Sequence, residues 1–349
     1  MARTLVFATL LAGLCISPPA LNGKVSSNSG ASAQTVQQTV TRATAYLRTE
    51  SAAWLSSRTC AACHHIPMAL WALSEADRRG YEVDKQFITD TTETALGSVE
   101  KLMAVGLQAN PANPPDPRPM AAGVNIGAAF MAAVGSSLLP LEPGQRDTVT
   151  FIADDIVKKQ RGDGSWEFFL SRSPVNESQT TDAVWIIMAL QADNRPGALD
   201  SRRGAIEKAS AWLANASPPD NLQDKALGLL LASRAGKSRA EMQTPIDEIL
   251  ALQLEDGGWG QKADMPSDAF ATGEVLYVLS LAGYTPADAP IQRGIDFLVT
   301  TQAEDGSWLM TSRATPDGSP GSSKLLTPIT CAGAAWATLG LASLVPNGP

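Results

Sequence analysis

Histidine and cysteine are scarce in this sequence, whose 349 residues include two histidines and four cysteines. The histidines, His64 and His65, are adjacent, so no histidine elsewhere can add a ligand to a site built on them. Cationic side chains are outnumbered, 27 against 35 acidic ones. The formal charge of −8 argues against nucleic acid and anionic membrane surfaces as partners.

Long apolar runs are missing beyond the N-terminus, so we expect no membrane-spanning helix. Residues 1–3 are a short basic segment, and 5–14 are an apolar one of signal-peptide length. We therefore expect residues 1–33 to be a signal peptide and leader, cleaved between 20 and 33. Residues 34–349 are then a single domain located in the periplasm or secreted.

The most specific motif in the chain is Cys60-Ala61-Ala62-Cys63-His64. Cys-x-x-Cys-His is the sequence to which haem c is attached, with the two thiols bonded to the haem and the imidazole bound to iron. Cys60, Cys63 and His64 therefore predict a c-type haem. The sixth ligand is then Met, water or nothing, and nothing selects between Met120 and Met131. This interpretation gives a redox or ligand-sensing role and implies a redox partner.

Three segments of the chain align without gaps, namely 153–166, 246–259 and 295–308. Each ends in Gln-x-x-Asp-Gly-x-Trp. The tryptophans are spaced by 259 − 166 = 93 and 308 − 259 = 49 residues, so a degenerate copy is expected between the first two. Residues 209–215 are the candidate for this copy, which has lost the glutamine and the Asp-Gly-x-Trp. A repeat of about 50 residues indicates an array of helix pairs.

Each repeat predicts an outer helix that ends near the glutamine, a tight Asp-Gly turn, and a tryptophan that packs back on the helix end. The following helices are apolar almost all round, as inner helices are. No run alternates like a strand. Earlier helices are expected at 33–56, 66–79, 84–107 and 121–138. The fold class is therefore all-α, an α/α toroid of about six helix pairs.

The repeated Gln-x-x-Asp-Gly-x-Trp resembles the QW motifs of squalene–hopene cyclases and prenyltransferase-type toroids. The chain also resembles an exported bacterial group in which Cys-x-x-Cys-His precedes such repeats. The resemblance implies that Trp166, Trp259 and Trp308 are structural staples. It also implies an apolar small molecule, an isoprenoid or lipid, inside the barrel. Six inner-helix aromatics are candidates to line such a cavity: Trp71, Phe130, Trp185, Phe270, Tyr277 and Trp336.

Cyclases of this family protonate their substrate with the middle Asp of an Asp-x-Asp-Asp motif that opens an inner helix. Residues 178–182 match that place without the middle acid. Asp154 and Asp155 look like a remnant of the motif, but the repeat aligns Asp154 with Asp247 and Asp296 on outer helices. A terpene-cyclase-like enzyme is therefore the alternative function.

A leucine recurs near the middle of each inner helix, and the residue eight positions before it is His65, Asp182, Asp268 or Cys331. We therefore expect these four residues to be the first residues of inner helices, all at one rim of the barrel. Prenyltransferase-type toroids hold zinc at this rim, so a metal-dependent enzyme is a further form of the alternative. The non-haem ligand set is Cys60, Cys63, His65, Asp182, Asp268 and Cys331. Asp182 and Asp268 also fit as helix N-caps worth about 1 kcal/mol each. A Cys60–Cys63 disulfide on a non-catalytic binding scaffold is the third interpretation.

Overall fold

The computed structural model describes residues 30–57, 65–107, 124, 126–138, 140–168, 173–192, 197–217, 221–310 and 323–348. This part of the chain forms twelve α-helices and contains no β-strand beyond an isolated bridge, which confirms the all-α class. None of the helices in these ranges has the length and apolar character that crossing a membrane requires.

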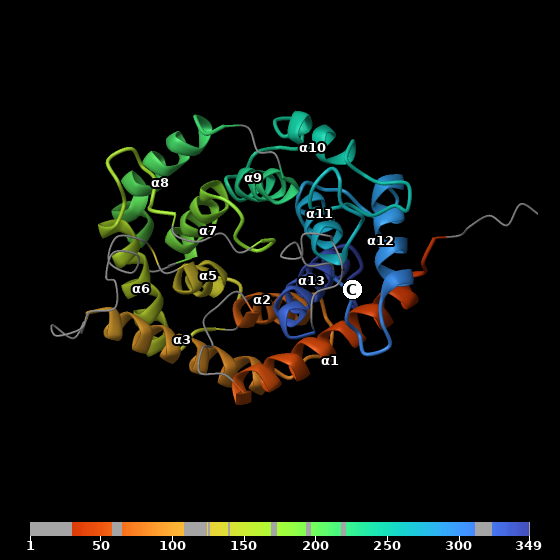
Figure 1. Cartoon of the computed structure of the whole chain (residues 1–349), viewed down its shortest axis with the longest axis horizontal. Helices are drawn as coiled ribbons and strands as arrows, with labels where there is room; N and C mark the ends of the chain where they lie inside the picture. The colour runs from red at the N-terminus through yellow and green to blue at the C-terminus, as the bar shows by residue number, and fades with distance from the viewer. Residues whose placement is uncertain are drawn as a thin grey trace, which may run out of the picture.

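The helices alternate between an inner and an outer ring (Figure 1). The inner ring comprises α2 (His65–Arg78), α5 (Ile126–Gly135), α7 (Gln179–Ala192), α9 (Leu222–Arg234), α11 (Ala269–Leu281) and α13 (Ser323–Leu344). The outer ring comprises α1 (Ala33–Ser57), α3 (Lys85–Leu107), α6 (Pro143–Lys158), α8 (Ala198–Ala214), α10 (Gln243–Leu250) and α12 (Ala289–Thr301). Six pairs result, as the repeat predicts.

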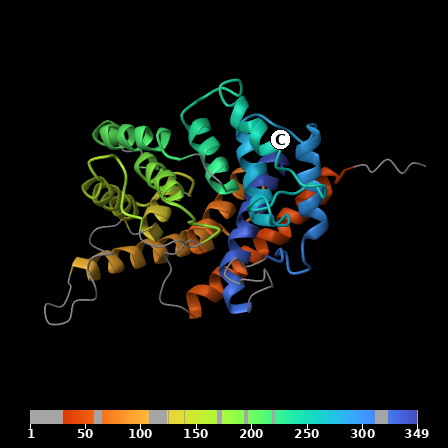
Figure 2. The same cartoon turned by 45° about the horizontal axis from the view of Figure 1, so that its top comes forward.

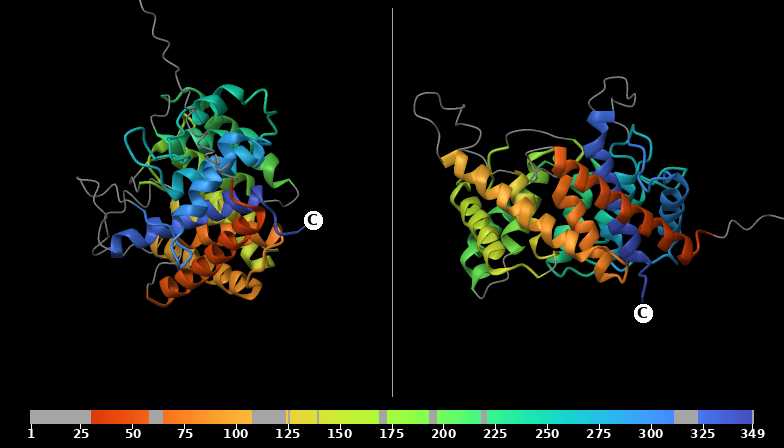
Figure 3. Two further views of the ribbon diagram at one scale, coloured as in Figure 1. Left: turned by 90° about the vertical axis from the view of Figure 1, so that its right-hand side faces the viewer. Right: turned by 90° about the horizontal axis from the view of Figure 1, so that it is seen from below.

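The inner ring is closed, because each inner helix contacts the next and α13 contacts α2. Outer helices α6 and α8 lie at one end of the ring and α12 at the other (Figure 2). Seen from below, α1 and α3 form one wall (Figure 3). Because inner and outer helices alternate along the chain, all inner helices begin at the same rim. The structure is the expected α/α toroid.

The three repeated tryptophans lock the ends of the outer helices. Each is buried, and its indole N–H donates to the carbonyl of the residue ten positions earlier. The pairs are Trp166 with Ile156 at 2.9 Å, Trp259 with Ile249 at 2.8 Å and Trp308 with Leu298 at 2.9 Å. A buried indole N–H thus adds a hydrogen bond to a carbonyl in the last turn of each outer helix. The staple role expected of these residues is what the hydrogen bonds show.

The repeated glutamines join one outer helix to the next. Gln302, after α12, donates to the carbonyl of Gly306 at 3.1 Å and to that of Thr39 in α1 at 3.0 Å. Gly306 has φ +89°, and a Cβ there would lie 2.3 Å from the carbonyl oxygen of Arg42. Glycine is therefore required both by the turn and by the close approach of α1. This junction seals the last outer helix to the first.

The centre of the ring is filled by aromatic side chains. The six inner-helix aromatics form one connected cluster in which Trp71 lies 5.3 Å from Trp336, 5.5 Å from Tyr277 and 6.0 Å from Trp185 between ring centroids. Phe130 packs on Trp185 at 4.1 Å, and Phe270 lies 6.3 Å from Trp336. These rings therefore pack mainly on one another, as a core does.

Candidate active site

The first turns of three neighbouring inner helices bring acidic side chains together at the rim where the inner helices begin. The helix α9 contacts both α7 and α11. Asp182 lies in the first turn of α7 and Asp224 in that of α9, while Asp268 precedes α11. Glu274 follows further along α11. We call these four residues the acid cluster.

Asp224 is the hydrogen-bonded centre of the acid cluster. It is 6% exposed and accepts from the Ser178 hydroxyl at 2.9 and 2.8 Å and from the Thr181 hydroxyl at 2.6 Å. The side-chain amide of Asn221 donates to the Asp224 Oδ2 at 2.9 Å, and the Asn221 side-chain oxygen accepts from the Asp224 backbone N–H and so caps α9. Three donors satisfy this carboxylate, so its negative charge is held in a fixed place beside its neighbours.

Asp182 is a carboxyl that holds its proton at neutral pH. Burial raises its pKa to about 8, opposed by a hydrogen bond from Asn176 and assisted by the charge of Asp224. Its Oδ1 atom is buried without a hydrogen-bond partner among the described residues. The residue as a whole is only partly buried. Asp182 is therefore a neutral acid at the rim, in a residue that is partly exposed.

Asp182 is not the N-cap that the sequence suggests. The helix α7 begins at Gln179, and the Ser178 hydroxyl accepts from the Thr181 amide at 2.9 Å in the capping position. Asp182 is one turn further in. On a helix, residues three apart share a face, so Asp182 lies one turn above Trp185 of the aromatic cluster.

Glu274 is the most deeply buried of the four acids, at 1% exposed. Neither carboxyl oxygen has a hydrogen-bond partner in the described part of the chain. Burial raises its pKa well above the usual range, and the charges of Asp224, Asp268 and Glu177 add to this. The gap that Glu274 borders with Phe270 and two glutamine side chains has no room for a water molecule. Glu274 is therefore a neutral acid in a dry place.

Asp268 is the N-cap of α11, which confirms its expected structural role. Its Oδ1 accepts from the Ala271 amide at 2.9 Å and its Oδ2 from the Gln261 amide at 2.6 Å. Its negative charge lies at the positive end of the helix dipole, where it is stabilised.

His65 and Cys331 meet at a different place on the ring. His65 is the first residue of α2 and is fully buried, stacked on Trp54 with ring centroids 4.1 Å apart. Its Nε2 lies 3.8 Å from a carboxyl oxygen of Glu50, and the Cys331 Sγ lies 3.9 Å from its carbonyl oxygen. Burial raises the pKa of the Cys331 thiol. This thiol is therefore protonated at neutral pH.

Cys331 does not open an inner helix, so the position predicted for it from the sequence is wrong. The helix α13 begins at Ser323, so Cys331 lies two turns inside it. His65 and Asp268 do open their helices. The expected helix at 121–138 is α5, bounded by Ile126 and Gly135.

The proposed cofactor residues Cys60, Cys63 and His64 lie outside the described residues, as do Met120 and residues 1–29 of the expected signal peptide and leader. Of the non-haem set, the structure brings His65 to Cys331 and Asp182 to the acid cluster with Asp268. Within the described ranges, no three His, Cys, Asp or Glu side chains are grouped as a metal site would need. The haem and zinc predictions therefore remain predictions.

Sequence reasoning missed Asp224 and Glu274. A signal was present for Glu274, which is the single charged residue in the apolar helix Ala269–Leu281. A charge inside such a run is costly unless it is paired or neutral. Asp224 lies in a helix with several other polar residues, and its sequence gives no comparable signal.

Comparison with known proteins supports the fold more than any activity. No known family profile matches the chain. A drimenyl diphosphate synthase from Streptomyces showdoensis is 26% identical over 187 residues, which is 54% of this chain and 27% of that protein. The chain thus matches only about a quarter of the length of this relative.

Two solved structures resemble the whole ring. The type II terpene cyclase MstE from Scytonema, in complex with geranylgeranyl dihydroxybenzoate, aligns with a TM-score of 0.52 at 12% identity, covering 90% of this chain and 98% of that one. An unsaturated glucuronyl hydrolase specific for heparin aligns with a TM-score of 0.57 at 10% identity, covering 90% and 97%. The protein has the α/α-toroid fold of the terpene cyclases, and the hydrolase shows that this fold serves more than one chemistry.

Proposed function

We propose that this protein is a terpene-cyclase-like enzyme that protonates a carbon–carbon double bond of an isoprenoid. The observation that carries the proposal is Asp182, a carboxyl that is neutral at pH 7 and partly accessible at the rim of an α/α toroid. An acid with a pKa near the working pH is protonated in the resting state and can give its proton to a bound substrate.

In the proposed reaction the proton of Asp182 passes to one alkene carbon, whose π electrons form the new C–H bond. The neighbouring carbon becomes a cation, and a second double bond of the same substrate attacks it to close a ring. Loss of a proton from the cyclic cation forms the product alkene, and Asp182 takes up a proton again. The product is an isomer of the substrate.

The surroundings of Asp182 suit this chemistry. Trp185, one turn below it, belongs to the buried aromatic cluster. Aromatic π faces stabilise cations that reach them. The charge of Asp224 lies close enough to affect Asp182 and is held by three hydrogen bonds. It stabilises positive charge near the site without itself moving.

The test uses the purified full chain with acyclic prenyl diphosphates of increasing length and with geranylgeranyl dihydroxybenzoate. We expect a cyclic product of unchanged mass, which gains one deuterium when the reaction runs in D₂O. Asp182→Asn should lower the rate by about 100-fold or more. Asp247→Asn, on an exposed outer-helix position, should leave it unchanged. Full activity in Asp182→Asn, or no cyclised product from any substrate, would contradict the proposal.

A second candidate is hydrolysis of a carbohydrate. Asp182 and Asp224 place a neutral carboxyl beside a negatively charged one at the rim. A neutral carboxyl and a carboxylate are also the pair that glycoside hydrolases use. Release of sugar from an unsaturated glucuronyl disaccharide, together with inactivity on isoprenoids, would favour this candidate.

Haem c attachment at Cys60 and Cys63, with His64 as the iron ligand, remains a proposal for an exported form of the protein. The segment that contains these residues immediately precedes α2, which begins at the same rim as the acid cluster. The absorption spectrum of the pyridine haemochrome, after expression in a host that matures haem c, tests it. A thioether-linked haem band supports attachment, and Cys60→Ser should remove it.

A further inference from the structure

The narrow gap beside Glu274 is lined by side chains that carry oxygen. Its four polar side chains are Glu177, Gln223, Gln261 and Glu274. Glu177 comes from the segment before α7, Gln223 from the first turn of α9, Gln261 from the segment before α11, and Glu274 from α11 itself. Gln223 and Gln261 are each 4% exposed and Glu274 is 1% exposed. We call this place the oxygen gap.

The two glutamines of the oxygen gap use their amide nitrogens elsewhere. The Nε2 atom of Gln223 donates to the Val175 carbonyl at 3.2 Å, and that of Gln261 donates to the Asp268 carboxylate at 2.6 Å. An amide whose nitrogen is engaged keeps its oxygen for another partner. The Gln261 Oε1 and both oxygens of Glu274 have no such partner among the described residues.

Neither water nor a proton can satisfy these oxygens. The oxygen gap has no room for a water molecule. A proton on Glu274 supplies one O–H, which pairs with one acceptor and leaves the second oxygen of Glu274 unpaired. Buried polar atoms without partners are costly and rare, and an ion that contacts several of them at once removes the cost.

The size and charge of the oxygen gap favour calcium. Ca²⁺ binds carboxylate and amide oxygens at about 2.3–2.6 Å, whereas a water molecule keeps about 2.7–3.2 Å from its partners, so the ion fits a narrower space. Mg²⁺ usually keeps several waters, for which this gap has no room. The negative charges of Asp224, Asp268 and Glu177 lie close enough to affect Glu274, so a doubly charged cation is favoured over a singly charged one.

We propose that the oxygen gap binds one Ca²⁺ ion through the carboxylates of Glu177 and Glu274 and the side-chain oxygens of Gln223 and Gln261. The ion would join the segment before α7 to α9 and α11 and so stabilise this rim. Such a site contains two carboxylates, which agrees with the finding that no three metal-binding side chains are grouped in the described ranges. It does not depend on the proposed cyclisation, because Asp182 is not one of its ligands.

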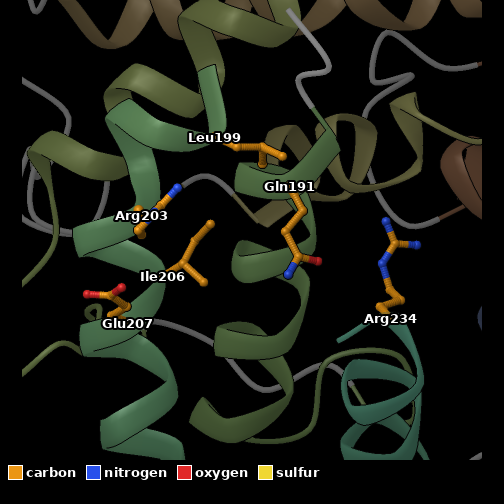
Figure 4. A pocket seen from close by; sticks show the side chains of 6 residues that line it. All are labelled: Gln191, Leu199, Arg203, Ile206, Glu207 and Arg234. Carbon is orange, nitrogen blue, oxygen red and sulfur yellow. The ribbon is translucent and has the colours of Figure 1, made fainter. Parts of the chain in front are cut away.

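A larger pocket at the opposite rim does not select a ligand in this way. It has a volume of about 470 Å³ and is lined by Gln191, Leu199, Arg203, Ile206, Glu207 and Arg234 (Figure 4). Its three charged side chains belong to exposed residues, so water satisfies them. It also presents donors, acceptors and apolar groups together, whereas the unpartnered polar atoms of the oxygen gap are all acceptors.

The test uses the full chain after removal of bound metal with a chelator. Isothermal titration calorimetry with CaCl₂ should show one Ca²⁺ ion per chain, and the thermal unfolding midpoint should rise with added CaCl₂. MgCl₂ should bind about ten-fold more weakly or not at all, and NaCl at equal ionic strength should not raise the midpoint. Glu274→Gln and Glu177→Gln should each weaken Ca²⁺ binding about ten-fold or more.

The matched control is Glu75→Gln, which removes another buried acid. Glu75 lies near the far end of α2 and pairs with Arg78 and Arg79, outside the oxygen gap. This variant should bind Ca²⁺ as wild type does. The proposal is overturned if Ca²⁺ does not bind, if Mg²⁺ binds as tightly, or if Glu274→Gln binds Ca²⁺ as well as wild type. Equal weakening by Glu75→Gln would also overturn it.

Discussion

Trp308 in the outer wall and Glu274 in the acid cluster are both 1% exposed, but they differ in whether their polar atoms are hydrogen-bonded. The Trp308 indole N–H donates to the Leu298 carbonyl at 2.9 Å. Neither oxygen of Glu274 has a partner among the described residues, and neighbouring acids raise its pKa further. A paired polar group in the wall stabilises the fold, whereas an unpaired acid costs stability. Such costs are expected where a protein keeps groups for chemistry.

The largest expected effect comes from removing a staple. Trp308→Ala should lower the free energy of unfolding by about 3–5 kcal/mol, since it empties a large buried site and removes the hydrogen bond to the Leu298 carbonyl. Urea denaturation followed by circular dichroism measures it. Trp212→Ala is the control, because Trp212 lies inside the outer helix α8 and is only partly buried. Similar losses in both variants would show that the wall does not depend on its staples.

The second prediction concerns pH and Glu274. In the unfolded chain this carboxyl ionises near pH 4.5, whereas in the folded protein burial and neighbouring charges keep it neutral. The folded state therefore binds the extra proton, and wild-type stability falls by about 1.4 kcal/mol per pH unit above 4.5 until the folded pKa is reached. Glu274→Gln lacks this slope. Its stability relative to wild type should therefore rise between pH 5 and pH 7.

A paired acid supplies the control for that experiment. Glu75 forms ion pairs with Arg78 and Arg79, whose hydrogen bonds and charges hold its pKa below the usual range against the effect of burial. Glu75→Gln should therefore be less stable than wild type by an amount that stays constant between pH 5 and pH 7. A constant difference for Glu274→Gln as well would mean that Glu274 is not neutral in the fold.

A smaller loss is expected at the glutamine that seals the ring. Gln302→Ala removes hydrogen bonds to the carbonyls of Thr39 and Gly306 and should cost about 1–2 kcal/mol. The thermal unfolding midpoint of the purified variant reports it. Gln243→Ala, which removes an exposed hydrogen bond to Asp247, should cost less than about 0.5 kcal/mol.

The smallest effect is expected at Asp268. Asp268→Ala removes the N-cap of α11 and should cost about 1 kcal/mol. Asp268→Asn, which keeps an acceptor for the Ala271 amide, should recover most of the loss. If Asp268→Asn is no better than Asp268→Ala in chemical denaturation, the charge of Asp268 and not its capping bond is what matters.

The ring was predictable because its determinants are local. The glutamine, the Asp-Gly turn and the tryptophan lie within seven residues, so their spacing survives in the sequence of each copy. The position of Cys331 was not predictable in this way. The count assumed inner helices of equal length, whereas α13 has 22 residues against 14 in α7.

The acid cluster could be predicted only in part. Asp182 and Asp268 were visible as acids at the starts of apolar helices. The proton on Asp182 depends on burial and on Asp224, which lies 42 residues further along the chain and on another helix. Burial and distant charges are products of the tertiary structure, so a sequence pattern does not carry them.

The hydrogen bond from Gln302 to Thr39 has a consequence for how the chain is made. A chain emerges from the ribosome N-terminus first, so α1 and α2 are made long before α12 and α13. These four helices meet where the end of the ring contacts its beginning, a junction that we call the seam. The apolar faces of the first helix pair therefore stay exposed until synthesis is nearly complete, and chaperones can bind them during that time. A circular permutant that begins at α11 would deliver both sides of the seam together and should fold with less aggregation.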